Sequence, residues 1–495
     1  MRHVLSEFTY SPKVFPNFVN GRREEPSGEG SLEITNPATG RRLGKLTYSS
    51  RTQVDEAVGS AQEAFEKWAS EPVTERVNRL IQLHNLLKAE EENIARLIVQ
   101  ENGKTVDDAR GEVKRGIENV EASLSAIYKL DGRRTVNIAP GIDEELMLEP
   151  LGVFAAVTPF NFPMMIPFWF IPYALATGNT FVLKPSDRTP TTMNYIFSRI
   201  LEERIFPDGV LNLINGGREV VEQIIDDNRV AGVSFVGSTA VGRQVFDRCC
   251  SRRKRVQVQA SAKNFIVVMP DAKLDAALSN MMNSFYGNAG ERCLAGSNLV
   301  CFERNHDEVL RKFVSAAASL KLGYGLDETV AMGPLITREH LNRVKGYIEK
   351  GIEEGAAAAL DGREITVHEY PEGNFLGPTV LDGVQEDMAV AREEIFGPVA
   401  SFITTEDLDE SIEMINRSRY GNMAVIYTSD GAAARRFRLK AKAGNIGINV
   451  GVAAPAATYP FGGCRESFFG QLHGQGGEDY LSFYTDRRVA IERWL

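Results

Sequence analysis

The chain has 495 residues, of which 43% are hydrophobic and 25% are charged, and its formal net charge is -10. A chain of this length exceeds what one hydrophobic core supports, so we expect two or three domains. The composition is that of a globular protein, which excludes a disordered chain and a membrane channel. Because the charge is modestly acidic and no basic stripe recurs, we expect no nucleic-acid partner.

The five cysteines are an odd number, and their spacing matches no zinc or disulfide framework. We therefore expect no metal site and a reducing compartment. The first residues show neither a signal-peptide apolar core nor an Arg-rich presequence, which favours the cytoplasm. The cysteines are Cys249, Cys250, Cys293, Cys301 and Cys464. All except Cys293 are expected to be packing residues, although Cys464 stays open between packing and contact with a ligand.

Two amphipathic helices are predicted near the start of the chain. The first begins at Thr52, where Thr52 and Asp55 form a capping pattern, and the second begins at Thr74. His84 in the second helix has no partner ligand at i+4, so we interpret it as a packed or surface residue.

Residues 154–176 are almost all apolar and long enough to cross a bilayer. Four prolines contradict a membrane span, because each one removes a backbone donor that a lipid-facing helix needs. We predict a strand that ends near Pro159, followed by a buried helix.

From residue 147 to residue 269, short apolar runs alternate with helical segments, and the alternation resumes with longer helices from 273 to 447. This pattern is typical of parallel strands joined by crossover helices, so we predict two α/β domains. Residues 133–150 and 480–494 are expected to be extended. Exposed strands of this kind must be paired, which favours a subunit contact.

Two strand ends are candidate phosphate or ligand sites. Gly237 and Ser238 follow the apolar run "VSFV", where the amides at a helix N-terminus suit a pyrophosphate, although such a turn is structural at least as often. Lys184 directly follows the run "TFVL", and a lysine at the end of a buried strand is costly without a partner. In open α/β sheets this carboxyl edge is where ligands bind.

Five motifs occur in one order along the chain: "TPFNFPMM", "LKPSDRTP", "FVGSTAVG", "NAGERCLAG" and "EEIFGPV". In this order and spacing the chain resembles the aldehyde dehydrogenase superfamily. The resemblance implies a Rossmann-type NAD-binding domain (1–122 and 141–262), a second α/β catalytic domain (263–447) and a β oligomerisation arm (123–140 and 468–495). It also implies a homo-oligomer, either a dimer or a tetramer.

The resemblance implies that Cys293 is the nucleophile and that Asn161, with the Cys293 amide, forms the oxyanion hole. A fixed amide donor at such a site stabilises the transition state by roughly 3 to 4 kcal/mol. Arg292 is expected to favour the thiolate of its neighbour Cys293. Asp187 stands where a glutamate often contacts the adenosine ribose, so NAD is expected rather than NADP. The expected cofactor-binding residues are Thr158, Pro159, Phe160, Lys184, Ser186, Asp187, Gly237, Ser238, Glu394 and Phe396.

Gln259 occupies the position at which hydrolytic members of this family carry the glutamate that activates water. An amide accepts no proton at neutral pH, so hydrolysis of a thioester would lose a factor of about 10² to 10⁴ in rate. Coenzyme A is the natural acyl acceptor. The stretches "GEVKRGIENVE", "PFNFPMMIPFW" and "GERC" resemble the CoA-acylating methylmalonate-semialdehyde dehydrogenase subfamily.

In that subfamily two arginines hold the substrate carboxylate, and they match Arg115 and Arg292. A guanidinium fork binds a carboxylate in a fixed orientation. From spacing alone, Arg115 would be a surface residue paired with Glu112 or Glu118, and only the resemblance reverses that interpretation. The thioester would lose CO₂ before transfer to CoA, giving acetyl-CoA or propionyl-CoA.

Three hypotheses stay open at this point. The first is the acylating enzyme acting on malonate or methylmalonate semialdehyde, two substrates that the sequence does not distinguish. The second is a hydrolytic aldehyde dehydrogenase in which Glu466 or Glu291 serves as the base. The third is a non-catalytic binding protein, against which the joint presence of Cys293, Asn161 and the cofactor residues argues.

Overall fold

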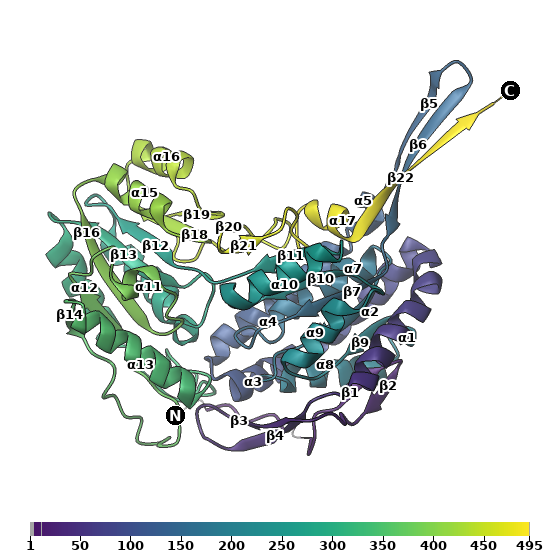
Figure 1. Ribbon diagram of the computed structural model, residues 1–495. Helices are drawn as coiled ribbons and strands as arrows, with labels where there is room; N and C mark the ends of the chain where they lie inside the picture. The colour runs from purple at the N-terminus through teal and green to yellow at the C-terminus, as the bar shows by residue number, and fades with distance from the viewer. Residues whose placement is uncertain (1–3, 11, 495) are drawn as a thin grey trace.

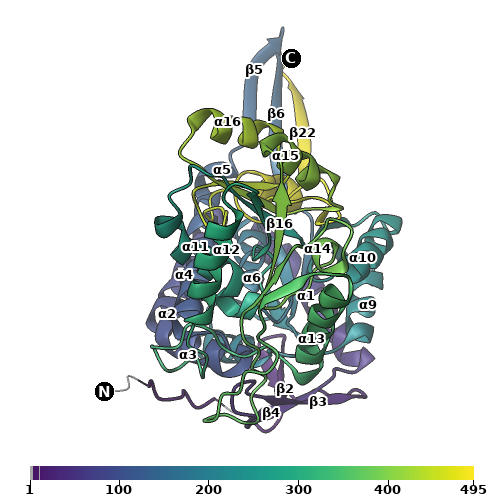
Figure 2. The same cartoon turned by 90° about the vertical axis from the view of Figure 1, so that its left-hand side faces the viewer.

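Two large β-sheets lie side by side, and a narrow arm projects from one of the two lobes that they form (Figure 1). The computed structural model describes residues 4–10 and 12–494. The predicted fold class, two α/β domains with an extended arm, is confirmed. A view turned by 90° shows the arm rising above the body, away from the N-terminus (Figure 2).

The eight-stranded sheet has five parallel strands at its centre, and antiparallel strands at both edges. Its strands, in sheet order, are β2 (Arg22–Glu24), β1 (Asn17–Val19), β9 (Leu211–Leu213), β8 (Thr180–Lys184), β7 (Val153–Val157), β10 (Val230–Val236), β11 (Arg255–Gln259) and β21 (Phe468–Phe469).

Helices cover both faces of this sheet because its central strands are apolar on both sides. In β7, Val153 and Ala155 pack with one set of helices, whereas Phe154 and Ala156 belong to the main core on the other face. On the first face lie α1 (Arg51–Ser70), α9 (Arg218–Asp226) and α10 (Thr239–Ser251). The opposite core includes α2 (Val73–Ala89), α3 (Glu91–Asn102), α4 (Val106–Ser123), α7 (Ile171–Ala176) and α8 (Thr191–Glu202).

The first helix begins at Arg51, one residue before the predicted start, and its N-cap lies two residues before the predicted cap Thr52. The N-cap is Ser50, whose hydroxyl accepts from the Gln53 amide while the Gln53 side chain accepts from the Ser50 amide. The second predicted helix is confirmed as α2. The apolar stretch after residue 153 forms β7, α6 (Met165–Phe168) and α7, as predicted, and among the described residues there is no helix with the length and apolarity of a bilayer span.

The seven-stranded sheet forms the other lobe. Its strand order is β14 (Ala357–Leu360), β15 (Thr379–Asp382), β16 (Val399–Thr405), β13 (Gly296–Phe302), β12 (Asn264–Val268), β18 (Met423–Tyr427) and β19 (Asn445–Ile448). Its helices are α11 (Leu274–Tyr286), α12 (His306–Ala318), α13 (Arg338–Glu353), α14 (Ala389–Arg392), α15 (Leu408–Arg417) and α16 (Gly431–Lys440). Two short ribbons, β3 (Ser31–Thr35) with β4 (Arg42–Thr47) and β17 (Tyr420–Gly421) with β20 (Cys464–Arg465), complete the strands outside the arm.

The arm consists of β5 (Arg133–Ala139), β6 (Ile142–Pro150) and β22 (Thr485–Arg493), with β6 in the middle. The two predicted extended segments therefore pair with each other, except that residues 480–484 belong to a short helix, α17 (Asp479–Tyr484). The predicted domain boundaries stay a prediction. Two strands differ from the predicted boundaries. Strand β6, predicted in the NAD-binding domain, lies in the arm, and β21, predicted in the arm, pairs with β11 in the eight-stranded sheet.

Candidate active site

The nucleophile loop runs from Gly287 to Cys293, between α11 and β13. Asn288 and Ala289 have φ values of 51° each, and Gly290 has φ 74°. A Cβ on Gly290 would lie 2.3 Å from the Gly397 carbonyl oxygen, so only glycine fits there. Although this stretch is polar, Asn288 and Glu291 are buried and hydrogen-bonded within the loop network.

Cys293 borders two cavities at once. The cavity of about 550 Å³, here called the cofactor-side cavity, contains eight of the predicted site residues together with His340 and Arg343. The cavity of about 400 Å³, here called the substrate-side cavity, contains Cys293, Arg115 and Arg292. The cofactor-side set is Pro159, Phe160, Asn161, Gly237, Ser238, Cys293, Glu394 and Phe396. These predicted residues therefore lie around Cys293, which lines both cavities.

Aromatic and charged groups share the wall of the substrate-side cavity. Phe162, Trp169 and Phe461 supply an apolar surface, with the Trp169 and Phe461 ring centroids 4.9 Å apart. Arg115 and Arg292 lie on the same wall, so the cavity offers an apolar floor and two guanidinium groups beside the nucleophile. This combination suits a short anionic substrate.

Asn161 is buried, and its main chain is anchored by an ion pair that the sequence analysis missed. The Asn161 amide nitrogen Nδ2 donates to the Glu291 carbonyl at 2.9 Å. The Asn161 carbonyl accepts from Lys104 Nζ at 2.7 Å, and that ammonium also pairs with Glu112 at 2.7 Å. Both side chains of the pair are fully buried, and Glu112 also accepts from the Met164 amide at 2.8 Å. Lys104 and Glu112 therefore fix the loop that carries Asn161.

Burial dominates the ionisation of the Cys293 thiol. It raises the pKa of Cys293 to about 12, and the nearby Glu394 carboxyl acts in the same direction. The expectation that Arg292 favours the thiolate holds in direction, but other effects outweigh it. Arg292 does lower the pKa, but its effect is smaller than burial, and its guanidinium is itself paired with Asp108. Burial and the Glu394 carboxyl thus favour the neutral thiol in the free protein, while Arg292 opposes them.

A pH profile of alkylation tests this conclusion. With no ligand present, labelling of Cys293 by iodoacetamide should rise about tenfold for each pH unit from 7 to 9, because the thiolate fraction rises at that rate far below the pKa. Mass spectrometry of peptides follows Cys293, and the exposed Cys250 in the same digest is the internal control. A plateau reached below pH 8 would show that the free enzyme already holds a thiolate.

The predicted cofactor residues follow three neighbouring strands of the eight-stranded sheet. Thr158 follows β7, Lys184 ends β8 and Gly237 follows β10, and the register pairs Val157 with both Lys184 and Phe235. The Thr158 amide donates to the Lys184 carbonyl at 3.2 Å. Because parallel strands end at one edge of the sheet, residues distant in sequence converge there. Thr158, Lys184, Ser186 and Asp187 lie on this edge but not in the wall of the cofactor-side cavity.

The N-terminus of α10 fits a pyrophosphate. Ser238 is its N-cap, yet its hydroxyl makes no capping hydrogen bond, and the first turn carries no acidic residue. The Thr239 amide donates to the Ser261 hydroxyl at 3.2 Å, which leaves the next amides of this 13-residue helix, those of Ala240 and Val241, at the positive end of its dipole, beside Gly237 in the cavity wall. Lys184 is buried, which lowers the pKa of its ammonium, and Asp187 opposes that shift.

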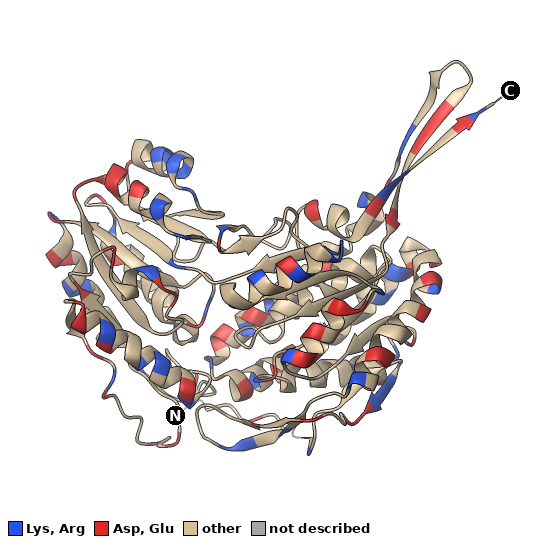
Figure 3. Cartoon of the chain, in the orientation of Figure 1, with Lys and Arg blue, Asp and Glu red and all other residues tan. Residues whose placement is uncertain are grey.

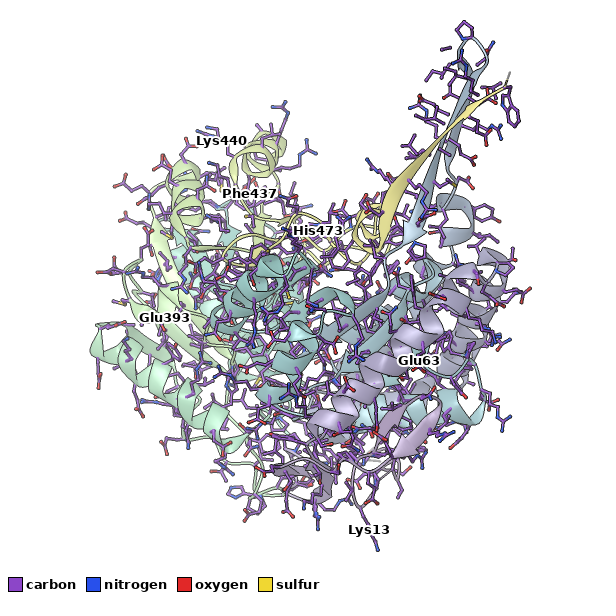
Figure 4. All side chains as sticks on the ribbon, turned by 45° about the vertical axis from the view of Figure 1, so that its right-hand side comes forward. Lys13, Glu63, Glu393, Phe437, Lys440 and His473 are labelled. Atoms are coloured by element: carbon purple, nitrogen blue, oxygen red, sulfur yellow. The ribbon has the colours of Figure 1, made fainter. Side chains whose placement is uncertain are left out.

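Helix α13 holds the loop of Glu394 and Phe396 through side chains that the sequence analysis did not single out. His340 Nε2 donates to the Phe396 carbonyl at 2.6 Å, with the ring nitrogen as donor, and Arg343 donates to the Ile395 and Glu394 carbonyls at 3.2 and 3.1 Å. Phe396 has φ 60°, a conformation that these bonds stabilise. The neighbouring Glu393 is labelled in Figure 4 on this lobe.

Gln259 is buried at the end of β11, where Phe468 of β21 is its cross-strand partner. Neither its Oε1 nor its Nε2 has a hydrogen-bond partner within the described parts of the chain. His473, labelled in Figure 4 between α16 and the base of the arm, stacks on the ring of Phe468, with the two ring centroids 4.3 Å apart. The position of the expected water-activating base therefore holds a buried amide.

The two alternative bases are poorly placed for hydrolysis. Burial raises the pKa of Glu291 well above its usual range, and the Ile336 amide donates to it at 3.2 Å. Glu466 pairs with Arg243 at 3.1 Å and with Arg419 at 3.0 Å. Neither Glu291 nor Glu466 is among the described residues that line the two cavities. These contacts argue against the hydrolytic hypothesis.

The model of the aldehyde dehydrogenase family matches residues 24–490. The chain belongs to the aldehyde dehydrogenase family. It is 45% identical to malonate-semialdehyde dehydrogenase 1 of Geobacillus kaustophilus (strain HTA426), over 97% of this chain and 98% of that protein. It is 44% identical to malonate-semialdehyde dehydrogenase of Bacillus cereus (strain G9842), over 98% of this chain and 99% of that protein.

Two solved structures are similar over the whole fold. A methylmalonate-semialdehyde dehydrogenase of Sinorhizobium meliloti 1021, complexed with NAD, superposes with a TM-score of 0.95 at 37% identity, over 97% of this chain and 98% of that chain. A methylmalonate-semialdehyde dehydrogenase of Oceanimonas doudoroffii gives a TM-score of 0.95 at 38% identity, over 98% and 99% of the two chains. The predicted family resemblance is confirmed.

Proposed function

We propose that this chain oxidises malonate or methylmalonate semialdehyde with NAD through a thioester on Cys293, and that decarboxylation and transfer to CoA complete the reaction. One observation carries the proposal. Two arginines share a cavity with Cys293, while the position of the hydrolytic base holds Gln259. The names of the relatives support the same substrate class.

Cys293 and Asn161 would perform the covalent step. The Cys293 sulfur attacks the aldehyde carbonyl, and its proton leaves to solvent or to a bound group. The carbonyl oxygen becomes an oxyanion, which the Asn161 amide and the Cys293 backbone N–H stabilise. Only one proton of Asn161 Nδ2 is used by the Glu291 carbonyl, so the other is available for this role.

NAD would lie along the cofactor-side cavity. The α10 amides with Gly237 and Ser238 would hold its pyrophosphate, Lys184, Ser186 and Asp187 its adenosine ribose, and Glu394 its nicotinamide ribose. Thr158, Pro159, Phe160 and Phe396 would surround the ring. Bound there, NAD supplies the two-electron oxidation that turns the thiohemiacetal into a thioester. The Tyr48 hydroxyl donates to Asp187 at 3.4 Å. The negative charge of Asp187 would repel the extra phosphate of NADP, which favours NAD.

The carboxylate of the substrate decides the fate of the thioester. Arg115 and Arg292 would hold it beside the thioester carbonyl. The bond between the carboxylate and the α-carbon breaks, CO₂ leaves, and the electron pair forms an enolate on the oxyanion donors. A proton then adds to the α-carbon. The thiol of CoA attacks the remaining thioester, and Cys293 is released.

We also infer a homo-oligomer, a dimer or a tetramer, built through the arm. Strand β6 carries four acidic residues, and two of them pair with arginines of the neighbouring strands, Asp143 with Arg134 at 3.2 Å and Glu149 with Arg488 at 2.6 Å (Figure 3). Apolar side chains nevertheless stay exposed on the arm, namely Val136, Ile138, Val489, Ile491 and Trp494. A partner subunit would cover them. The five cysteines are free, which supports a cytoplasmic location.

The decisive experiment supplies malonate semialdehyde, NAD and CoA, and identifies the product by mass. We expect acetyl-CoA and CO₂. Without CoA, we expect a burst of NADH near one per active subunit, followed by a slow rate. Release of a free acid at full rate without CoA would contradict the proposal.

A further inference from the structure

The Arg292 guanidinium is held on two sides by the protein itself. Its Nη2 pairs with the Asp108 carboxylate, and its Nη1 donates to the Asn283 side-chain oxygen at 2.9 Å and to the Asn283 carbonyl at 3.3 Å. A Cβ on Gly287 would lie 2.7 Å from the Arg292 Cζ atom, so the glycine leaves room for the guanidinium. Only 13% of the Arg292 side chain is exposed.

One donor of this guanidinium has no partner within the described parts of the protein. Arg292 Nε is buried and has no hydrogen-bond partner among residues 4–10 and 12–494. A guanidinium presents two forked edges to carboxylates, and here Asn283 occupies the Nη1 end. Nε is shielded from solvent in this structure, so a substrate carboxylate would meet the part of Arg292 that lines the substrate-side cavity.

Asp108 connects this guanidinium to the nucleophile loop. One carboxylate oxygen pairs with Arg292, and the other accepts from the Asn288 amide at 3.0 Å. Asp108 lies in the first turn of α4, where the Thr105 hydroxyl accepts from its amide at 3.2 Å. A single carboxylate thus fixes both an arginine of the substrate-side cavity and a residue with φ 51° five positions before Cys293.

Arg115 has a different environment on the same cavity wall. Its side chain is 40% exposed, and its only carboxylate contact in the described parts of the chain is Glu118 at 3.7 Å. Its Nη1 donates to the Pro455 carbonyl at 2.9 Å. Because Asp108 balances the charge of Arg292, Arg115 is the less compensated cation of the two.

We propose that Asp108 is a positioning residue that sets specificity for carboxylated aldehydes. It holds Arg292 in the wall of the substrate-side cavity, so that Arg292 orients the substrate carboxylate while Arg115 supplies net positive charge. This inference rests on the proposed function, since it assumes that a substrate carboxylate enters the substrate-side cavity.

Asp108→Asn tests the inference, with Asp107→Asn as the matched control. The Asp107 side chain is 82% exposed, lies in the same helical turn and lines the same cavity, but its ion-pair partner among the described residues is Arg110, at 3.6 Å, and not Arg292. The readout is kcat/KM for malonate semialdehyde divided by kcat/KM for propanal, which has no carboxylate. We expect this ratio to fall about tenfold or more in Asp108→Asn, to stay within about twofold in Asp107→Asn, and to recover in part in Asp108→Glu.

A second readout needs no turnover. The rate at which iodoacetate alkylates Cys293, relative to neutral iodoacetamide, should fall in Asp108→Asn and not in Asp107→Asn. An equal loss for both aldehydes would overturn the inference, because Asp108 would then only support the fold. A ratio that rises would overturn it too, because Asp108 would then merely weaken the cation. A wild-type enzyme with no preference for the carboxylated aldehyde would instead refute the proposed function.

Discussion

Replacing Cys293 by serine is expected to abolish aldehyde oxidation, with a fall in kcat of about four orders of magnitude or more. The site already raises the pKa of the Cys293 thiol to about 12. An alcohol is intrinsically far less acidic than a thiol, so the serine hydroxyl is a much weaker nucleophile at this position. Formation of NADH with malonate semialdehyde and CoA measures the loss.

Cys250→Ser is the matched control, because Cys250 is exposed at the end of α10 and borders neither cavity. It should keep wild-type kcat. NAD binding by Cys293→Ser, followed by fluorescence titration, should be unchanged and shows that the cavity is intact. Turnover by Cys293→Ser above about 1% of wild type would mean that another group attacks the aldehyde.

The strand pattern predicted where most of the site would assemble. Thr158, Lys184 and Gly237 each follow or end a buried parallel strand, and neighbouring parallel strands end at one edge. The sequence therefore predicts the meeting of these residues without any knowledge of side-chain positions. The family motifs added Cys293, Asn161 and Glu394, which the structure brings to one cavity.

Residues that hold the site in place could not be predicted in the same way. Lys104 contacts the Asn161 carbonyl across 57 positions, and Asp108 reaches Arg292 across 184. Each lies on or beside a helix, where a charged residue ordinarily faces solvent. Only the packing of α4 against the nucleophile loop shows that these charges are compensated inside the protein.

The helix start and the nucleophile loop show a local limit of sequence patterns. Ser50 and Thr52 are both good capping residues, and the reciprocal bonds with Gln53 decide for Ser50. Polar side chains such as those of Asn288 and Glu291 ordinarily lie at the protein surface. Their buried state depends on partners such as the Asn161 carbonyl and the Ile336 amide, which lie far away in the sequence.

Gln259→Glu is expected to give the enzyme a hydrolytic activity that does not need CoA, raising that rate by about 10² to 10⁴. Glutamate has almost the shape of glutamine, and both terminal atoms of Gln259 lack partners among the described residues, so the substitution breaks no hydrogen bond there. Gln259 itself lines neither cavity, but the next residues, Ala260 and Ser261, line the cofactor-side cavity. By the family pattern, a carboxylate at position 259 accepts the proton of a water that attacks the thioester. Steady NADH formation after the first turnover, without CoA, is the measurement.

Gln257→Glu is the matched control, because Gln257 lies two residues earlier on β11, is also buried, and donates to the Ser234 hydroxyl at 3.0 Å. It should gain no hydrolysis. Since burial raises the pKa of an introduced carboxyl, the new activity should increase as the pH rises through that pKa, where the base becomes ionised. If Gln259→Glu still stops after one turnover, the missing base is not what reserves the acyl group for CoA, and exclusion of water from the thioester must be the cause instead.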